Sequence, residues 1–170
     1  MKYTRFEELP VWNAAINLAV KTYTFTSKAV FKGQFSLRDQ IERATVSISS
    51  NIAEGFERGT TQELLTFLYI ARGSAGEVRS QLCLIERLPA FSDFKSEISD
   101  LKSLAEGISK QLRGWADSLQ NSKIPGQRYL TEKSRRADQE TRDRQEFLER
   151  LQKIRDGGSE KPGPMMPGKG

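Results

Sequence analysis

The most informative absence in this 170-residue sequence is histidine, which does not occur at all, and cysteine occurs only once, as Cys83. Zinc sites of the usual Cys/His type are therefore excluded within one chain, as are Ser-His-Asp and Cys-His catalytic groups. A glycine-rich phosphate loop is also missing. We expect a protein that is not an enzyme and that holds no metal and no cofactor.

Long hydrophobic runs are missing as well, and a bilayer-spanning helix needs about 20 consecutive apolar residues. The first residues, MKYTRFEELPVW, lack the apolar core of a secretory signal. A single cysteine cannot form an internal disulfide, which fits a reducing compartment. These features predict a cytoplasmic protein without a membrane partner.

Charge is present in both signs with a basic excess. The chain has 27 Lys and Arg against 22 Asp and Glu, a net charge of +5, and its isoelectric point is about 9.4. A basic balance favours an acidic partner such as nucleic acid. An excess of this size is equally consistent with a mildly basic surface that binds nothing acidic.

Hydrophobic spacings of three and four residues recur along residues 1–121 and predict four amphipathic helices. The expected starts are Pro10, an N-cap at Ser36, a capping box of Thr60 with Glu63, and an N-cap at Ser92 or Asp93. The expected apolar stripes are Trp12, Ile16, Ala19 and Tyr23; Leu37, Ile41, Thr45, Ile48 and Ile52; Leu64, Leu68, Ala71, Ala75, Val78, Leu82 and Ile85; and Leu101, Ala105, Ile108, Leu112, Trp115 and Leu119. We predict an all-α fold, an antiparallel four-helix bundle over residues 1–121.

The remaining chain differs in composition. Residues 122–156 read as a linker and a charged helical extension, and residues 157–170, GGSEKPGPMMPGKG, read as a disordered Gly/Pro-rich tail. Within the extension, Phe147, Leu148, Leu151 and Ile154 keep helical spacing. Because this apolar surface is too small to fold alone, the extension is either a helix that docks on a partner chain or a solvated tail.

Polar residues form a second stripe along the second predicted helix, opposite its isoleucines. They are Arg43, Ser47, Asn51, Glu54 and Arg58, at spacings of four, four, three and four. Solvated helix faces usually carry Glu, Lys and Gln, so small Ser and Asn side chains favour close approach by another helix.

The third predicted helix repeats this pattern with Arg72, Ser74 and Glu77 and places Gly73 and Gly76 in its interior. A mid-helix glycine costs about 1 kcal/mol relative to alanine, and tight packing or a backbone contact usually offsets that cost. We expect Arg72 and Glu77 to pair with Arg43, Arg58 or Glu54, in a network within the bundle or between subunits. A catalytic carboxylate pair of Glu54 and Glu77 is disfavoured because no nucleophile accompanies it.

Basic side chains that could contact nucleic-acid phosphates are spread along the chain rather than gathered in one stripe. The candidates are Lys21, Lys28, Lys32, Lys110, Arg113, Arg135, Arg136, Arg142 and Arg144. A ring of identical subunits would strengthen such a weak patch, because each subunit adds its own phosphate contacts.

Three stretches resemble a known family: LPVWNAAINLAVKTYTFT, FSLRDQIERATVSISSNIAEGFERGT and ELLTFLYIARGSAGEVRSQL. They are similar to the bacterial four-helix bundle proteins encoded in intervening sequences of 23S ribosomal RNA genes. The same fold serves as the accessory variability protein of diversity-generating retroelements. The resemblance covers roughly residues 5–120, and the pairing of SISSNIAEGFERG with IARGSAGEV is its most specific part.

This resemblance implies a homopentameric ring with a basic surface and, in the retroelement members, binding to nucleic acid and to a reverse transcriptase. The matching motif positions are Asn51, Glu54, Gly55, Arg58, Arg72, Gly73, Ser74 and Glu77. The chain departs from the family pattern at Gln34, where an acidic residue is usual, and at Glu42, where a basic residue is frequent. Glu42 makes that face a poorer surface for nucleic acid. The alternative function is a structural or protein-interaction module.

Overall fold

The structure is a computed structural model that describes residues 3–121 and 143–152, and these fall into two separate units. All regular elements of the described residues are helices, so the predicted all-α class is confirmed. In chain order the elements are η1 (Phe6–Glu8), α1 (Pro10–Thr26), η2 (Ala29–Phe31), α2 (Phe35–Glu57), α3 (Thr61–Ile85), η3 (Pro89–Phe94) and α4 (Lys95–Gln120), followed by a helix at residues 143–152.

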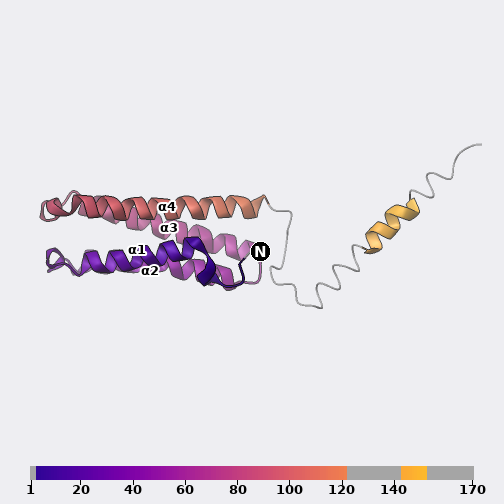
Figure 1. The fold of residues 1–170 in the computed structure, drawn as a ribbon, viewed down its shortest axis with the longest axis horizontal. Coiled ribbons are helices and arrows are strands. Elements are labelled where there is room, and N and C mark those ends of the chain that lie inside the picture. The colour runs from indigo at the N-terminus through magenta and orange to yellow at the C-terminus, as the bar shows by residue number, and fades with distance from the viewer. Residues whose placement is uncertain (1–2, 122–142, 153–170) are drawn as a thin grey trace, which may run out of the picture. The chain divides into compact units, whose positions relative to one another are not determined.

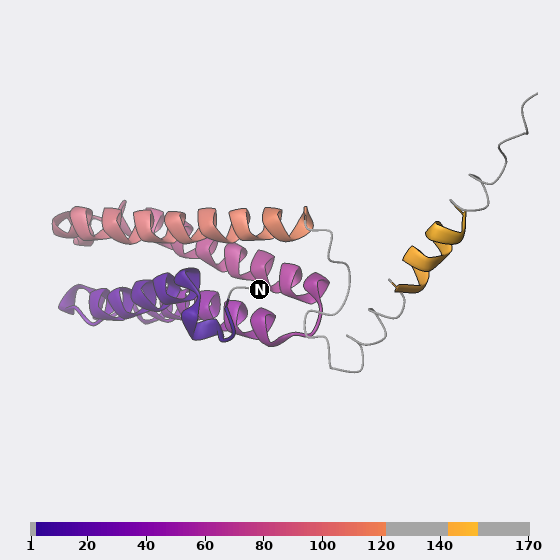
Figure 2. The same ribbon diagram turned by 45° about the vertical axis from the view of Figure 1, so that its right-hand side comes forward.

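The four long helices lie side by side, as Figures 1 and 2 show from two directions. Helix α1 packs against α2 and α4, and α3 also packs against α2 and α4. Within the described residues, no helix is both long enough and apolar enough to cross a membrane.

The apolar faces of the four helices form one core. Every residue of the stripe predicted for α3 is buried, and so are Ile41, Thr45, Ile48 and Ile52 of α2 and Leu101, Ala105, Ile108 and Leu112 of α4. Trp115 and Leu119 lie half-buried against this core. The stripes predicted for α2, α3 and α4 therefore identify the faces that turn inward.

The stripe predicted for α1 is only partly right. Ala19 is buried and Trp12 packs half-buried against the core, whereas Tyr23 is 46% exposed. The buried residues of the helix are Val11, Ala15, Leu18, Ala19, Thr22, Phe25 and Thr26. Two faces of α1 carry apolar residues at helical spacing, so periodicity alone did not separate them.

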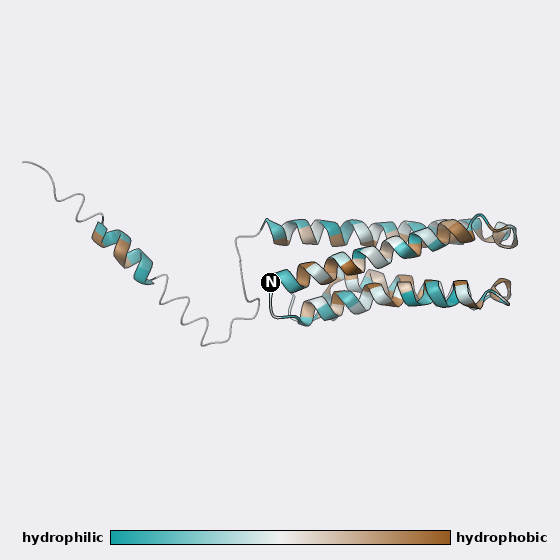
Figure 3. Ribbon diagram, turned by 180° about the vertical axis from the view of Figure 1, so that it is seen from behind, coloured by the Kyte–Doolittle hydropathy of each residue, from teal (hydrophilic) through white to brown (hydrophobic). Residues whose placement is uncertain are grey.

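Phenylalanines close the end of the unit where α1 connects to α2 and α3 connects to α4. The ring of Phe31 lies 5.1 Å from that of Phe25 and 4.9 Å from that of Phe91, centroid to centroid, with edge-to-face geometry. Phe94 adds a ring 6.0 Å from Phe25. Figure 3 shows brown, hydrophobic stretches beside hydrophilic ones in both connections. Aromatic packing thus fixes the two loops at this end.

Two predicted starts are confirmed and two are wrong. Helix α1 begins at Pro10, and the Glu63 amide of α3 donates to the Thr60 hydroxyl at 3.2 Å. That hydroxyl donates in turn to the Glu63 carboxylate, which does not reach the Thr60 amide as expected. Ser36 is not a cap, because α2 already begins at Phe35, just after Gly33 turns the chain with φ +84°.

The predicted cap of α4 fails for a related reason. Ser92 and Asp93 both lie inside η3, the short helix that Pro89 opens. The chain passes directly from η3 into α4, whose N-cap residue, Phe94, provides no side-chain hydrogen bond. Because the helical segment η3 leads directly into α4, no polar side chain caps the N-terminus of α4.

Candidate functional site

The small polar side chains of α2 lie on the flank of the helix that adjoins α3. The Ser47 and Ser74 hydroxyl oxygens are 3.0 Å apart across the two helices. The Asn51 amide donates to the Ser47 carbonyl at 2.7 Å and to its hydroxyl at 3.0 Å. These three residues form the α2–α3 polar seam. The prediction of a close helix contact is right, but the stripe borders the core instead of lying opposite it.

The charged members of the predicted network pair within their own helix. Arg43 binds Asp39 at 3.1 Å and Arg58 binds Glu54, each one helical turn away. The Arg58 guanidinium also lies over the Phe67 ring of α3, 5.1 Å from its centroid. Side chains four residues apart on a helix are neighbours, which explains why these ion pairs form within α2 and not between helices.

The remaining charged members of the predicted network, Arg72 and Glu77 of α3, form no ion pair with the predicted partners on α2. Glu77 accepts a hydrogen bond from Gln81 at 3.3 Å, and Arg72 makes no ion pair within residues 3–121. The predicted pairing of Arg72 and Glu77 with Arg43, Arg58 or Glu54 is therefore wrong in the single chain.

The glycines divide into one that packs and two that do not. A Cβ at Gly55 of α2 would lie 2.6 Å from Cβ of Phe67, so only glycine allows α2 and α3 to approach so closely there. At Gly73 and Gly76 a Cβ would meet nothing within 4 Å, and both are exposed. The expectation that these two glycines mark tight packing inside the bundle is wrong.

The described phosphate-contact candidates predicted from the sequence come from several different elements. Lys21 and Lys32 are exposed, while Lys28 pairs with Glu97 at 3.4 Å and lies over the Phe94 ring. On α4, Lys110 pairs with Glu106 at 2.8 Å and Arg113 with Asp117 at 3.6 Å. Arg144 is exposed on the helix at residues 143–152, and Arg135, Arg136 and Arg142 lie outside the described residues.

A polar groove between α3 and α4 brings together cations that sequence reasoning missed. It has a volume of about 410 Å³. Its lining residues, which define the α3–α4 groove, are Gly76, Arg79, Ser80, Cys83, Ser99, Lys102, Ser103 and Glu106. Arg79 and Lys102 come from different helices. Predicting this site would have required the register between α3 and α4, which sequence periodicity does not provide.

Ion pairs set the protonation states around this groove. Lys102 donates to Glu86 at 2.9 Å, and this hydrogen bond is the main cause that lowers the pKa of Glu86 and raises the pKa of Lys102. The pKa of Glu106 is lowered first by its hydrogen bond from Lys110 and further by the charges of Lys110 and Arg79. These shifts favour the charged forms of Glu86, Lys102 and Glu106.

Glu42, where the resembled family often has a basic residue, has a structural role. Its carboxylate accepts from the Thr26 hydroxyl of α1 and from Nε of Arg38 at 2.8 Å. Its side chain is only 14% exposed. Glu42 therefore joins α1 to α2 and is not part of an open basic surface.

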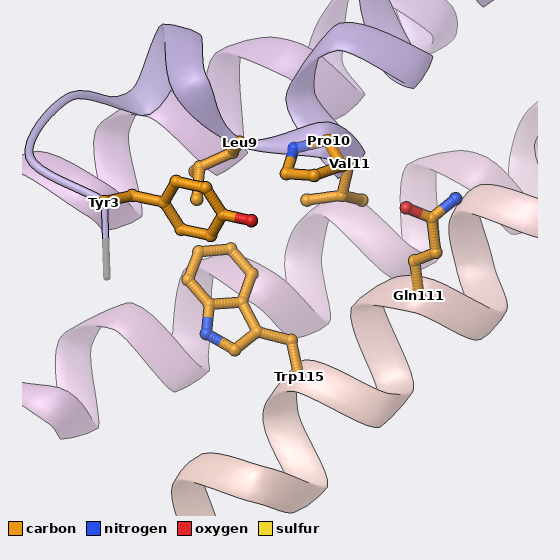
Figure 4. Close-up of a pocket in the computed structure, with 6 residues that line it drawn as sticks. All are labelled: Tyr3, Leu9, Pro10, Val11, Gln111 and Trp115. Atoms are coloured by element: carbon orange, nitrogen blue, oxygen red, sulfur yellow. The ribbon is translucent and has the colours of Figure 1, made fainter. Parts of the chain in front are cut away.

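An apolar pocket of about 300 Å³ lies where α1 begins. Tyr3, Leu9, Pro10, Val11, Gln111 and Trp115 line it, and Figure 4 shows the Tyr3 and Trp115 rings close together. Among its lining residues, the side chains that carry polar groups are those of Tyr3, Gln111 and Trp115. No described group of three or more Cys, Asp and Glu side chains is arranged to hold a metal ion.

Comparison with known proteins identifies the family. A crystal structure of a protein with unknown function from the S23 ribosomal protein family of Bacteroides thetaiotaomicron VPI-5482 has a similar fold. The TM-score is 0.54 at 20% identity, over 62% of this chain and 97% of that chain. No curated protein matches the sequence. The sequence model of the 23S rRNA-intervening sequence protein matches residues 7–114, well over half of the chain, and the protein belongs to this family.

Proposed function

We propose that this protein is a cytoplasmic, non-enzymatic antiparallel four-helix bundle that assembles into a homopentamer and binds RNA or DNA. The observation that carries the proposal is membership of the 23S rRNA-intervening sequence family together with a net charge of +5. A basic surface attracts the phosphate backbone without needing a base-specific site. The resemblance to accessory variability proteins makes a reverse transcriptase the proposed protein partner.

Electrophoretic mobility shift of the full chain tests the nucleic-acid part. Single-stranded and duplex RNA and DNA are titrated at low salt, where phosphate contacts are strongest. We expect a shifted band that salt weakens. No shift with any of the four probes, with or without a reverse transcriptase, overturns the proposal.

Multi-angle light scattering tests the assembly. A ring implies a particle of about five times the 19.2 kDa chain mass at micromolar concentration. The exposed Gly73 of α3, which does not line the α3–α4 groove, supports an interface, because it leaves room for the backbone of another subunit to approach. A monomer at that concentration would contradict the ring.

A second candidate function is a protein-interaction module, and the helix at residues 143–152 favours it. Phe147, Leu148 and Leu151 are 61%, 54% and 47% exposed there. An apolar helix face of this kind fits a hydrophobic groove on a partner. If Phe147→Ser with Leu151→Ser abolishes partner capture while wild type binds no nucleic acid, this second function replaces the first.

A further inference from the structure

Three contacts fix how α3 and α4 face each other. Glu86 meets Lys102, Arg79 meets Glu106 at 3.8 Å, and the Tyr69 hydroxyl accepts from Gln120 at 2.9 Å. Residue numbers fall on α3 as they rise on α4, so the two helices run antiparallel along this line. The α3–α4 groove occupies the part between Glu86 and Gly76, and Tyr69 lies further along the same line.

Cations outnumber carboxylates along this line. Arg79 and Lys102 line the groove itself. Arg72 lies seven residues before Arg79 and so shares its face of α3, while Lys110 and Arg113 follow Glu106 on α4. The carboxylates are Glu86, Glu106 and Asp117. Five cations against three carboxylates leave a positive excess beside the groove, and the 3.8 Å pair of Arg79 is a long one.

The groove also offers donors that suit phosphate oxygens. Ser80, Ser99 and Ser103 line it with exposed hydroxyls. Gly76 lines it without a side chain, and a Cβ there would meet open space, so a ligand can approach the backbone of α3 closely. Hydroxyls and cations from two helices therefore converge on one recess.

An aromatic platform lies at the far end of the line. Tyr69 is 42% exposed, and the hydrogen bond from Gln120 to its hydroxyl holds the ring in place between α3 and α4. Exposed aromatic rings beside cationic grooves bind single strands by stacking on their bases, because every base has a flat π-face.

We propose that the α3–α4 groove binds single-stranded nucleic acid, with backbone phosphates on Arg79 and Lys102 and a base stacked on Tyr69. This inference rests on the proposed function and adds its site and strand type. A duplex would present its phosphates on a rigid cylinder that cannot follow such a recess.

Fluorescence anisotropy with labelled oligo(dT) of about 20 nucleotides tests the site, since strands of this length cover one or more aromatic-cationic sites. The variant Arg79→Gln with Lys102→Gln should weaken binding roughly tenfold near 0.1 M salt, because two phosphate contacts are lost. The control Lys21→Gln with Lys32→Gln removes the same charge outside the groove and should cost clearly less. Circular dichroism confirms that both variants remain helical.

Tyr69 and Cys83 give two further readouts. Tyr69→Ala should weaken binding about fivefold or more, whereas Tyr69→Phe keeps the ring and should bind nearly as wild type. Cys83 is the sole cysteine and lines the groove, so bound oligo(dT) should slow its alkylation by N-ethylmaleimide in the wild-type chain.

The outcomes separate the site from the function. If wild type binds oligo(dT) but the groove variant loses no more affinity than the control, the site is wrong and the proposed function stands. Unchanged Cys83 alkylation in the bound state, or tighter binding of duplex than of oligo(dT), also overturns the site. If wild type binds no nucleic acid at all, the proposed function falls with it.

Discussion

The hydroxyl oxygens of Ser47 on α2 and Ser74 on α3 lie 3.0 Å apart, in a seam where Ser74 is buried and Ser47 is half-buried. Ser74 is 8% exposed and also donates to the Ile70 carbonyl at 3.2 Å. A hydroxyl pair at this point needs both helices close together, and small side chains permit it. The contact explains why serines interrupt an otherwise ordinary helix.

A double-mutant cycle measures this contact. Ser47→Ala and Ser74→Ala should each lower the free energy of unfolding by about 0.5–1.5 kcal/mol, because each removes the hydrogen bond between the two hydroxyls. The double variant should lose less than the sum of the two, since the shared bond is lost only once. Urea unfolding followed by circular dichroism gives the three values, and strict additivity would show that the hydroxyls do not interact.

Two glycine substitutions should have opposite effects on stability. Gly55→Ala places a methyl 2.6 Å from Cβ of Phe67 and should destabilise the fold by about 1–3 kcal/mol through overpacking. Gly73→Ala places its methyl in open space on an exposed helix and should stabilise the isolated chain by about 0.5–1 kcal/mol.

Thermal unfolding of the two glycine variants at one protein concentration provides the comparison. Equal effects of the same sign would contradict the close approach of α2 and α3 at Gly55. Light scattering of Gly73→Ala shows in addition whether the exposed face of α3 serves assembly.

Thr22 and Thr45 are both fully buried, but their hydroxyls differ. That of Thr22 has no hydrogen-bond partner among the described residues, whereas that of Thr45 donates to the Ile41 carbonyl at 2.6 Å. Thr22→Val should therefore raise the free energy of unfolding by about 1 kcal/mol, because it removes a buried unpaired polar group. Thr45→Val loses a bond and should be neutral or destabilising. A Thr22→Val variant less stable than Thr45→Val would refute this difference.

The Glu86–Lys102 pair should make stability depend on pH at both extremes. The pKa of Glu86 lies below its ordinary value of 4.5, so its contribution is present above pH 4.5 and disappears as the pH falls through the lowered value. The pKa of Lys102 lies above its ordinary 10.5, so its contribution holds below pH 10.5 and disappears as the pH rises through the raised value.

Urea unfolding of wild type and Glu86→Gln across the acid range tests the first limb. The difference in their free energies of unfolding should be constant near neutral pH and should shrink toward zero in acid. A difference that stays constant down to the lowest pH would show that the pair does not stabilise the folded state.

The spacing of apolar residues alone predicted which faces of α2, α3 and α4 are buried. The α3 stripe from Leu64 to Ile85 is buried throughout, although the same helix also exposes Tyr69, Ile70 and Leu84. Spacing predicted α1 only in part: Ala19 of the predicted stripe is buried, but Val11 and Trp12 begin two competing apolar faces. Capping rules worked at Thr60, where a loop precedes the helix, and failed at Ser92, where another helical segment does.

The candidate site was harder to predict, because it depends on contacts between helices. Ser47 and Asn51 could be recognised as unusual, but their closeness to Ser74 depends on the register of α2 and α3. The α3–α4 groove was missed for the same reason, since Arg79 and Lys102 are 23 residues apart in the sequence. The count of charged residues predicted a basic chain, but it did not locate the α3–α4 groove where Arg79 and Lys102 lie.

The salt dependence of nucleic-acid binding tests the central claim most directly. The dissociation constant of the wild-type protein for a single-stranded oligonucleotide is measured across a range of NaCl concentrations. Phosphate contacts predict that log affinity falls linearly with log salt, with a slope of about −0.7 for each contact on a single strand. We predict a slope steeper than about −1.4, as expected for two or more contacts from each chain. No binding at low salt, or an affinity that salt does not change, would contradict the account.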